Sequence, residues 1–312
     1  MDHRADLQRR RRSDHPFLSA GKVAHMTPVG FIGLGQIGTE MARRLLDWPA
    51  GLVVHDARPE AMTPLTDAGA EAASSPRDLA ERAGIISVMV RDDAQVDEVL
   101  AGPSGILASA SPGAVVAIHS TITDATAERL AGLAQPYGVS IVDAPVSGGA
   151  VGAQHGTLAV LAGGGAEAIE RCRAPFGHWA NHVMHAGPPG AGTRAKVARN
   201  LLHFVAFSAA AEAQRLAEAA GIDLTELGAV VRHSDAVTGG PGAIMLRPTT
   251  APMAADDGLR PILGHARDLG TKDLGLAIEL GDRLGVELPL ARHALDNLES
   301  DLGLGKPGTE EA

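Results

Sequence analysis

The sequence contains a single cysteine, Cys172, among its 312 residues. One cysteine excludes an intrachain disulfide and a cysteine-rich metal site, and a reducing compartment suits such a chain. Long apolar segments are also missing, since no run approaches the ~20 residues that span a bilayer. We therefore expect a cytoplasmic protein that makes no membrane contact, and nothing in the pattern requires a metal ion.

Aromatic residues and net positive charge are likewise scarce. Phe, Trp and Tyr make up 3% of the chain, so the core must be built mainly from Ala, Val, Leu and Ile. Alanine favours helices, whereas valine and isoleucine favour buried strands, so the composition suits an α/β protein. A formal net charge of −10 argues against a nucleic-acid-binding surface. The length is sufficient for two domains.

From residue 27 onward, short apolar runs alternate with stretches of helical length. Strands are predicted at residues 29–32, 52–55, 85–90, 115–118, 139–142 and 158–162. Because strands separated by helices require crossover connections, we expect a doubly wound parallel sheet with helices on both faces. This dinucleotide-binding domain is predicted over residues 27–190. Residues 1–26 and 305–312 are predicted to be a disordered extension and a flexible tail.

The character of the sequence changes after Gly187. A loop rich in glycine and proline leads into residues 193–220, which contain neither and predict one long helix with Gly221 placed to cap it. Only helical segments follow, so residues 191–304 are predicted to form a helical substrate and dimerisation domain. An alanine-rich helix of this length suits an interdomain spine or a subunit interface. We therefore expect a homodimer or a homotetramer.

A glycine-rich junction follows the first predicted strand and opens a helix. It reads Gly33-Leu34-Gly35-Gln36-Ile37-Gly38, which is the G-x-G-x-x-G pattern. The first glycine permits a tight turn, the second lets a pyrophosphate approach the backbone, and the third lets the helix pack against the strand. Oriented N–H groups at the helix N-terminus attract the anion. This junction predicts a dinucleotide site.

Asp56 stands at the end of the second predicted strand. A carboxylate in this place accepts a hydrogen bond from the adenosine 2′-hydroxyl and repels a 2′-phosphate, which favours NAD. Ala57 and Arg58 follow directly and belong to the same candidate site. Arg58 could pair with a 2′-phosphate, so NADP remains an alternative.

Two further segments have the chemistry of a substrate site. Residues 143–153 combine small residues with the Ser147 hydroxyl after a strand, which leaves backbone N–H groups for a carboxylate, although a plain glycine-rich turn is an equal alternative. Lys196 and Asn200 are four residues apart and share one face of the long helix, close to Val197. Considered alone, a lysine on a helix is more often a surface residue.

Taken together, these segments resemble the β-hydroxyacid dehydrogenase family, which includes 3-hydroxyisobutyrate dehydrogenase and tartronate semialdehyde reductase. The resemblance covers the chain from Val29 to about Leu298. It rests on five motifs in the expected order, at residues 30–38, 120–122, 143–149, 187–200 and 272–274. It implies a Rossmann-type domain followed by a helical domain like that of 6-phosphogluconate dehydrogenase.

The resemblance also implies a role for each matching residue. Lys196 matches the catalytic lysine, and Asn200 matches the asparagine beside it. The substrate carboxylate is held by the loop that contains Ser147, Gly148 and Gly149. Besides the glycine motif and Asp56, the positions that contact the cofactor are Val90, Arg91, Gln95, Thr121 and Lys272. At the position of Arg91, family members commonly have proline or another uncharged residue.

The implied activity is hydride transfer between NAD(P) and the CH–OH group of a small hydroxy acid. The candidate substrates resemble 3-hydroxyisobutyrate or the pair of 2-hydroxy-3-oxopropanoate and glycerate. A lysine with a pKa of ~10.4 is a poor base near neutrality, so we expect Lys196 to donate a proton in reduction and to stabilise charge in both directions. Two alternatives are an imine reductase-like NADPH enzyme and a catalytically silent nucleotide-binding homologue. Lys196 disfavours both.

Overall fold

The computed structural model describes residues 27–305. The predicted N-terminal extension, and the predicted tail beyond residue 305, lie outside this range. The chain divides into two compact units, the first ending at Ala198 and the second beginning at Arg199. This division falls within one helix, and the domain boundary expected at residue 190 stays a prediction.

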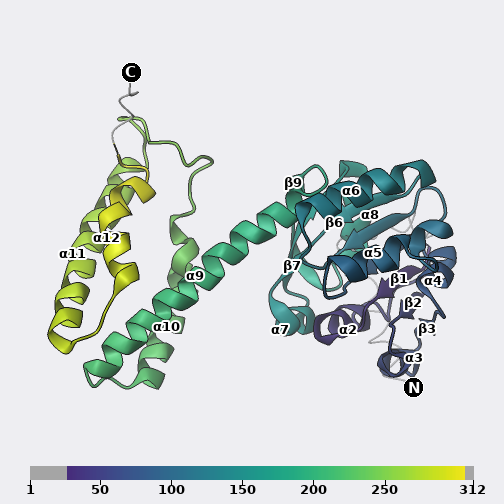
Figure 1. Ribbon diagram of the computed structural model, residues 1–312, viewed down its shortest axis with the longest axis horizontal. Helices are drawn as coiled ribbons and strands as arrows, with labels where there is room; N and C mark the ends of the chain where they lie inside the picture. Colours follow the sequence, from purple (N-terminus) through teal and green to yellow (C-terminus); the bar gives the residue numbers. More distant parts are fainter. Residues whose placement is uncertain (1–26, 306–312) are drawn as a thin grey trace, which may run out of the picture. The chain divides into compact units, whose positions relative to one another are not determined.

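The first unit is built on a nine-stranded sheet (Figure 1). Its strands are β1 (Val29–Ile32), β2 (Leu52–His55), β3 (Glu71–Ala72), β4 (Ile85–Val88), β5 (Val115–Ile118), β6 (Ser140–Asp143), β7 (Val146–Ser147), β8 (Leu158–Gly163) and β9 (Ala180–Gly187). The six strands predicted from the sequence are all present, with ends that move by one or two residues.

Six strands run parallel in the order β3-β2-β1-β4-β5-β6. The strand order reverses between β1 and β4, because β2 and β3 lie on one side of β1 while β4, β5 and β6 follow on the other side. Dinucleotides bind at the carboxyl ends of the strands at such a switch point. The far side of the sheet departs from the prediction, because β8 pairs antiparallel with β6 and β7. The sequence pattern missed β3 and β7, which have two residues each, and β9, whose residues are mostly polar or exposed.

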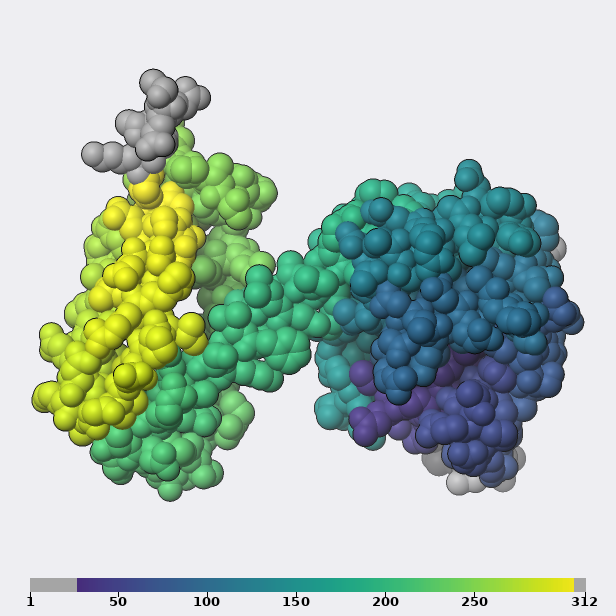
Figure 2. Space-filling view, in the orientation of Figure 1, coloured from purple at the N-terminus to yellow at the C-terminus, as the bar shows by residue number. Residues whose placement is uncertain are grey.

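Helices cover both faces of this sheet, as predicted. They are α2 (Gln36–Arg43), α3 (Thr63–Thr66), α4 (Pro76–Arg82), α5 (Asp93–Ala101), α6 (Asp124–Ala134), α7 (Gly149–His155) and α8 (Ala166–Phe176), with short 3₁₀ turns at Pro59–Ala61, Ile106–Ala108 and Gln135–Tyr137. Alternate residues of each strand enter opposite cores. Phe31 packs with side chains of α2 and α8, whereas Ile32 packs with those of α4, α5 and α6. In Figure 2 the surface of this unit that faces the viewer shows the blue to teal segments that include α5 and α6.

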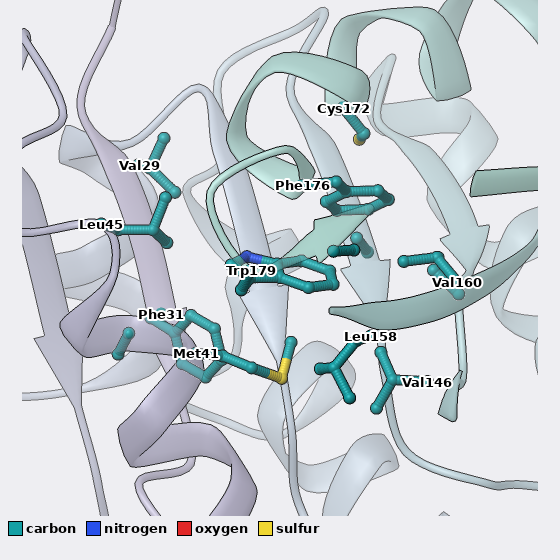
Figure 3. Packing of buried hydrophobic residues seen from close by; sticks show 14 of the residues in the cluster. Val29, Phe31, Met41, Leu45, Val146, Leu158, Val160, Cys172, Phe176 and Trp179 are labelled. Atoms are coloured by element: carbon teal, nitrogen blue, oxygen red, sulfur yellow. The ribbon is translucent and has the colours of Figure 1, made fainter. Parts of the chain in front are cut away.

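The core beneath α2 and α8 contains four of the eight aromatic side chains of the sequence, Phe31, Trp48, Phe176 and Trp179. Trp179 lies between Phe176 on one side and Phe31 with Met41 on the other (Figure 3). The ring centroids of Phe176 and Trp179 are 4.8 Å apart, and that of His119 is 5.0 Å from Trp179. Such contacts between rings add to the free energy gained by burial.

His119 is a polar group within this aromatic cluster. Burial lowers its pKa to about 4, so the imidazole is neutral at pH 7. Its Nδ1 donates to the carbonyl oxygen of Ala144 at 2.9 Å, and its Nε2 accepts from the Ser87 hydroxyl at 3.0 Å. His119 thus joins β4 and β5 to the chain that leaves β6.

The second unit is helical. Its elements are the later part of α9 (Ala191–Ala219), then α10 (Leu224–Thr238), a 3₁₀ turn at Gly240–Ile244, α11 (Arg260–Leu284) and α12 (Pro289–Asp301). No strand occurs in residues 191–305, which agrees with the prediction. Gly221 ends α9 at a φ of +74°, and the Ile222 N–H bonds to the Ala217 carbonyl at 2.9 Å, as a glycine cap requires.

Buried contacts hold the helices of this unit together. In Figure 2, α11 and α12 lie against each other in yellow-green and yellow. The Glu212 carboxylate of α9 accepts hydrogen bonds from the backbone N–H groups of Leu290 and Ala291, at 2.9 and 3.2 Å, in the first turn of α12. None of the helices in residues 27–305 is both long and apolar enough to cross a membrane.

Candidate cofactor and active site

The candidate cofactor residues of the first unit gather at one edge of the sheet. Gly33 follows β1, Asp56 follows β2, Val90 comes after β4 and Thr121 comes after β5. These strands are parallel neighbours, so their carboxyl ends meet at the same edge. The remaining candidate, Lys272, belongs to α11 of the second unit, where it is exposed and pairs with Asp273 at 3.1 Å.

The three glycines at the start of α2 occupy three different environments. Gly33 has a φ of +92°, and a Cβ there would collide with the Met89 carbonyl oxygen. A Cβ on Gly38 would collide with the Gly33 carbonyl, because α2 packs directly on the turn. A Cβ on Gly35 would meet no heavy atom within 4 Å. The backbone is therefore tightly packed on the protein side and open at Gly35, which fits the approach of a dinucleotide pyrophosphate.

Asp56 is bound to this glycine turn. Its Oδ2 accepts from the Leu34 N–H at 2.7 Å, and its Oδ1 accepts from the Arg58 N–H at 2.9 Å. The Arg58 guanidinium lies 3.3 Å from the same Oδ1. Burial alone would raise the pKa of the Asp56 carboxyl, but these hydrogen bonds and the Arg58 charge lower it below its usual value. The carboxylate is ionised at neutral pH, and Arg58 offsets part of its charge.

Polar contacts also connect the ends of β4 and β5. The Ser120 hydroxyl accepts from the Val90 N–H at 3.0 Å and donates to the Val90 carbonyl at 2.6 Å. The Arg91 N–H bonds to Oε1 of Gln95 at 3.0 Å, while the exposed Arg91 side chain pairs with Asp92 at 3.0 Å. Ser120 lies inside a recognised motif, but nothing in the sequence showed that it would bond to Val90.

The candidate substrate loop follows β6. Ser147 is half-buried at the end of β7, and Gly148 and Gly149 are exposed where α7 begins. Gly148 has a φ of +131° and Gly149 a φ of +64°, conformations that L side chains rarely adopt. The two glycines are thus needed for the path of the backbone.

Lys196 lies in the second turn of α9. Its side chain is 8% exposed, so it is not the surface lysine that its helical position alone would suggest. Asn200 follows one turn later, is half-buried, and its Oδ1 accepts from the Arg199 guanidinium at 3.3 Å. A long cationic side chain is rarely so deeply buried without a specific reason.

Two buried residues were not predicted as functional. His119 bonds to the Ala144 carbonyl oxygen, at the start of the candidate substrate loop. The Asp143 carboxylate accepts hydrogen bonds from the backbone at the start of α9. Asp143 is the first residue of a motif that the sequence did single out, but its partners lie in a segment more than forty residues away.

The three environments of the glycines lead to a prediction. Gly35→Ala should leave the melting temperature almost unchanged, because the new methyl group meets no protein atom, and should weaken NAD(H) binding at least about tenfold by blocking the approach to the backbone. Gly38→Ala should instead lower the free energy of unfolding by more than about 1 kcal/mol, because the methyl group meets the Gly33 carbonyl. Calorimetry and titration of NADH fluorescence measure the two effects. Equal effects of the two substitutions on stability would contradict this interpretation.

Two family models match the chain. One, described as the NAD binding domain of 6-phosphogluconate dehydrogenase, covers residues 28–187. The other, described as NAD-binding of NADP-dependent 3-hydroxyisobutyrate dehydrogenase, covers residues 190–301. The two models follow one another along almost all of the described chain.

Relatives agree with these models. An uncharacterized oxidoreductase of Mycobacterium tuberculosis H37Rv is 58% identical over 284 residues, which are 91% of this chain and 96% of the relative. The NAD-dependent L-serine dehydrogenase of Pseudomonas aeruginosa is 36% identical over 86% of this chain and 90% of its own. The solved structure of Mycobacterium tuberculosis 3-hydroxyisobutyrate dehydrogenase with L-serine has 30% identity and a TM-score of 0.62, covering 88% of this chain and 93% of that one. The chain therefore belongs to the β-hydroxyacid dehydrogenase family and is an NAD(P)-dependent oxidoreductase.

Proposed function

We propose that this protein catalyses reversible hydride transfer between NAD(P) and the CH–OH group of a small hydroxy acid, with Lys196 moving the proton. The observation that carries the proposal is the burial of Lys196, which is 8% exposed on α9 in a chain of this family. Removing an ammonium group from water costs free energy, and such buried charged groups cluster at functional sites. The burial of Lys196 therefore supports a role in the chemistry.

The residues divide the chemistry between them. The nicotinamide, when bound, supplies or accepts the hydride. The Lys196 ammonium donates a proton to the substrate oxygen in reduction, and its charge stabilises that oxygen in both directions. Asn200, one turn further along α9, orients the lysine or the substrate by a hydrogen bond.

The substrate carboxylate is assigned to the loop at Ser147, Gly148 and Gly149. The Ser147 hydroxyl and the backbone N–H groups of the two glycines are neutral donors, which suit a carboxylate. We propose acids that resemble 3-hydroxyisobutyrate, or the pair of 2-hydroxy-3-oxopropanoate and glycerate. Relatives named 3-hydroxyisobutyrate dehydrogenase and L-serine dehydrogenase support a short acid with a hydroxyl on its third carbon.

NAD is the proposed cofactor, held by the Gly33–Gly38 turn. The ionised Asp56 carboxylate can accept from an adenosine 2′-hydroxyl and opposes a 2′-phosphate. Arg58 pairs with Asp56, so its charge is partly engaged within the protein. The candidate contacts from Val90, Thr121 and Lys272 remain part of the proposal.

We propose that the protein acts in the cytoplasm as a homodimer or homotetramer formed through residues 191–304. Apolar side chains on α9 are exposed in the single chain, namely Leu201, Phe204, Val205 and Phe207. Phe204 and Phe207 are 59% and 57% exposed, in a chain that has five phenylalanines altogether. Exposed aromatic residues grouped on one helix are typical of a surface that a second copy covers.

A substrate panel tests the activity. Small 2- and 3-hydroxy acids should produce NADH absorbance at 340 nm when NAD is supplied, and kcat/KM should be higher with NAD than with NADP because Asp56 opposes a 2′-phosphate. A preference for NADP would instead indicate that Arg58 binds the 2′-phosphate on the adenosine ribose. No turnover of any hydroxy acid with either cofactor would refute the proposed function.

Removal of the lysine tests its role. Lys196→Ala should lower kcat by on the order of 10²- to 10⁴-fold and leave the Kd of NADH nearly unchanged, because the proton donor is lost but the glycine turn is intact. Arg215→Ala, which removes an exposed cation from the same helix, serves as the control and should keep the wild-type kcat. Turnover that survives in Lys196→Ala would rule out the assignment.

The oligomer is tested by light scattering after size exclusion. Wild type should have at least twice the 32.0 kDa of one chain. The double variant Phe204→Asp and Phe207→Asp should shift toward that single-chain mass, because carboxylates cannot be buried at an apolar contact without large cost. Leu133→Asp, at an exposed apolar residue of α6, is the control and should keep the wild-type mass. A wild-type protein that is monomeric at all concentrations would disprove the proposal.

A further inference from the structure

Asp143 is the last residue of β6 and the first residue of the motif that continues to the substrate loop. Its side chain is 1% exposed. One carboxylate oxygen, Oδ1, accepts from the Gly190 N–H at 2.8 Å, and the other, Oδ2, accepts from the Thr193 N–H at 2.7 Å. Both carboxylate oxygens of Asp143 therefore accept hydrogen bonds from the backbone at the beginning of α9.

The first turn of α9 depends on this carboxylate. The helix begins at Ala191, and the residue before it, Gly190, has no side chain with which to accept the N–H groups that a helix leaves unpaired. Asp143 bonds to the N–H groups of Gly190 and of the third helical residue, the two that a capping box satisfies from within the helix. Here both are satisfied by one carboxylate from a strand 47 and 50 residues earlier.

The helix start also touches the sheet without intervening side chains. A Cβ on Gly192 would collide with the carbonyl oxygens of Leu161 and Asp143. A Cβ on Gly163, at the end of β8, would lie 2.6 Å from the Gly192 nitrogen and 2.8 Å from the Pro188 carbonyl oxygen. These glycines allow α9 to start directly on the ends of β6 and β8, within reach of Asp143.

Burial raises the pKa of the Asp143 carboxyl, since the hydrogen bonds from Thr193 and Gly190 only partly compensate for the loss of water. A buried carboxylate is therefore a costly cap for the N-terminus of a helix. An exposed serine or aspartate cap, such as Asp223 at the start of α10, stabilises a helix with a smaller desolvation cost.

We propose that Asp143 is a positioning residue, which fixes the first turn of α9, and with it the Lys196 side chain, relative to the chain that leads into the substrate loop. Thr193 is bound directly and Lys196 follows three residues later on the same face of the helix. Asp143 is also four residues before Ser147, so one side chain ties the proton donor and the carboxylate loop to the same strand end. This role rests on the proposed function of Lys196.

Asp143→Asn tests the proposal. The amide keeps the shape and one carbonyl acceptor, but its NH₂ group faces a backbone N–H that needs an acceptor, so one of the two hydrogen bonds is lost. We expect kcat to fall about 10- to 100-fold, as for a reacting group displaced by about 1 Å, while the Kd of NADH changes less than about twofold. Amide hydrogen exchange should become faster at Gly190 and Thr193 and stay unchanged in the turn at Gly33–Gly38.

Asp223→Ala is the matched control. It removes the side-chain cap of α10, where Oδ1 of Asp223 accepts from the N–H groups of Thr225 and Glu226 at 2.8 and 2.9 Å. This variant should lose a similar amount of stability and keep kcat within about twofold of wild type, because no candidate site residue lies on α10. A wild-type kcat in Asp143→Asn, or an equal loss in both variants, would overturn the positioning role.

Two further measurements keep the outcomes distinct. If Asp143→Asn does not fold, hydrogen exchange of the wild-type protein decides, because rapid exchange at Gly190 and Thr193 would show that the carboxylate does not hold them. A wild type that oxidises no hydroxy acid, or a Lys196→Ala variant with full turnover, refutes the proposed function. An active wild type with an inactive Lys196→Ala and a fully active Asp143→Asn refutes only the positioning role.

Discussion

Backbone packed directly against backbone is the constraint on which the rest of this structure depends. At the start of α2, Gly38 lies on the carbonyl of Gly33, and Gly33 lies on that of Met89. At the start of α9, Gly192 lies on the ends of β6 and β8 in the same way. Both helices therefore begin at the carboxyl edge of the sheet with no side chains between. One of these two positions is the candidate dinucleotide turn, and the other begins the helix that carries Lys196.

A carboxylate accepts backbone hydrogen bonds at each of these two helix starts, Asp56 near α2 and Asp143 at α9. The two carboxylates differ in their exposure to solvent. Asp56 and Asp143 each accept two backbone hydrogen bonds from the segment that begins a helix or follows a strand. Asp56 is the more exposed of the two and has Arg58 beside it, so its pKa is lowered and its charge is available to a ligand. Asp143 is almost completely buried and has a raised pKa, so it acts on the protein itself. The same type of side chain is thus open to a ligand in one place and bound to the protein's own backbone in the other.

The sequence pattern predicted the strands that are apolar and at least four residues long, and it missed those that are short or polar. β7, with two residues, has no periodicity to recognise, and β9 exposes His182 and Met184 at a sheet edge. The antiparallel pairing of β8 could not be predicted either, since the hydrophobic pattern is the same for both directions. For the candidate site, the glycine turn and Asp56 were predicted from spacing alone, and Lys196 needed the family resemblance.

The sequence by itself determined the six apolar strands, the helical character of the second part of the chain, the glycine turn, the long helix with its Gly221 cap and the family. These properties depend on residues close together in the chain, where spacing reports local geometry. Only the tertiary structure decided that Lys196 is buried, that Ser120 bonds to Val90, and that Asp143 reaches the start of α9. The burial of Lys196 depends on how distant segments pack. The other two depend on which distant backbone groups still need a hydrogen-bond partner once the sheet has formed, and hydrogen bonds between segments tens of residues apart leave no periodic trace in a sequence.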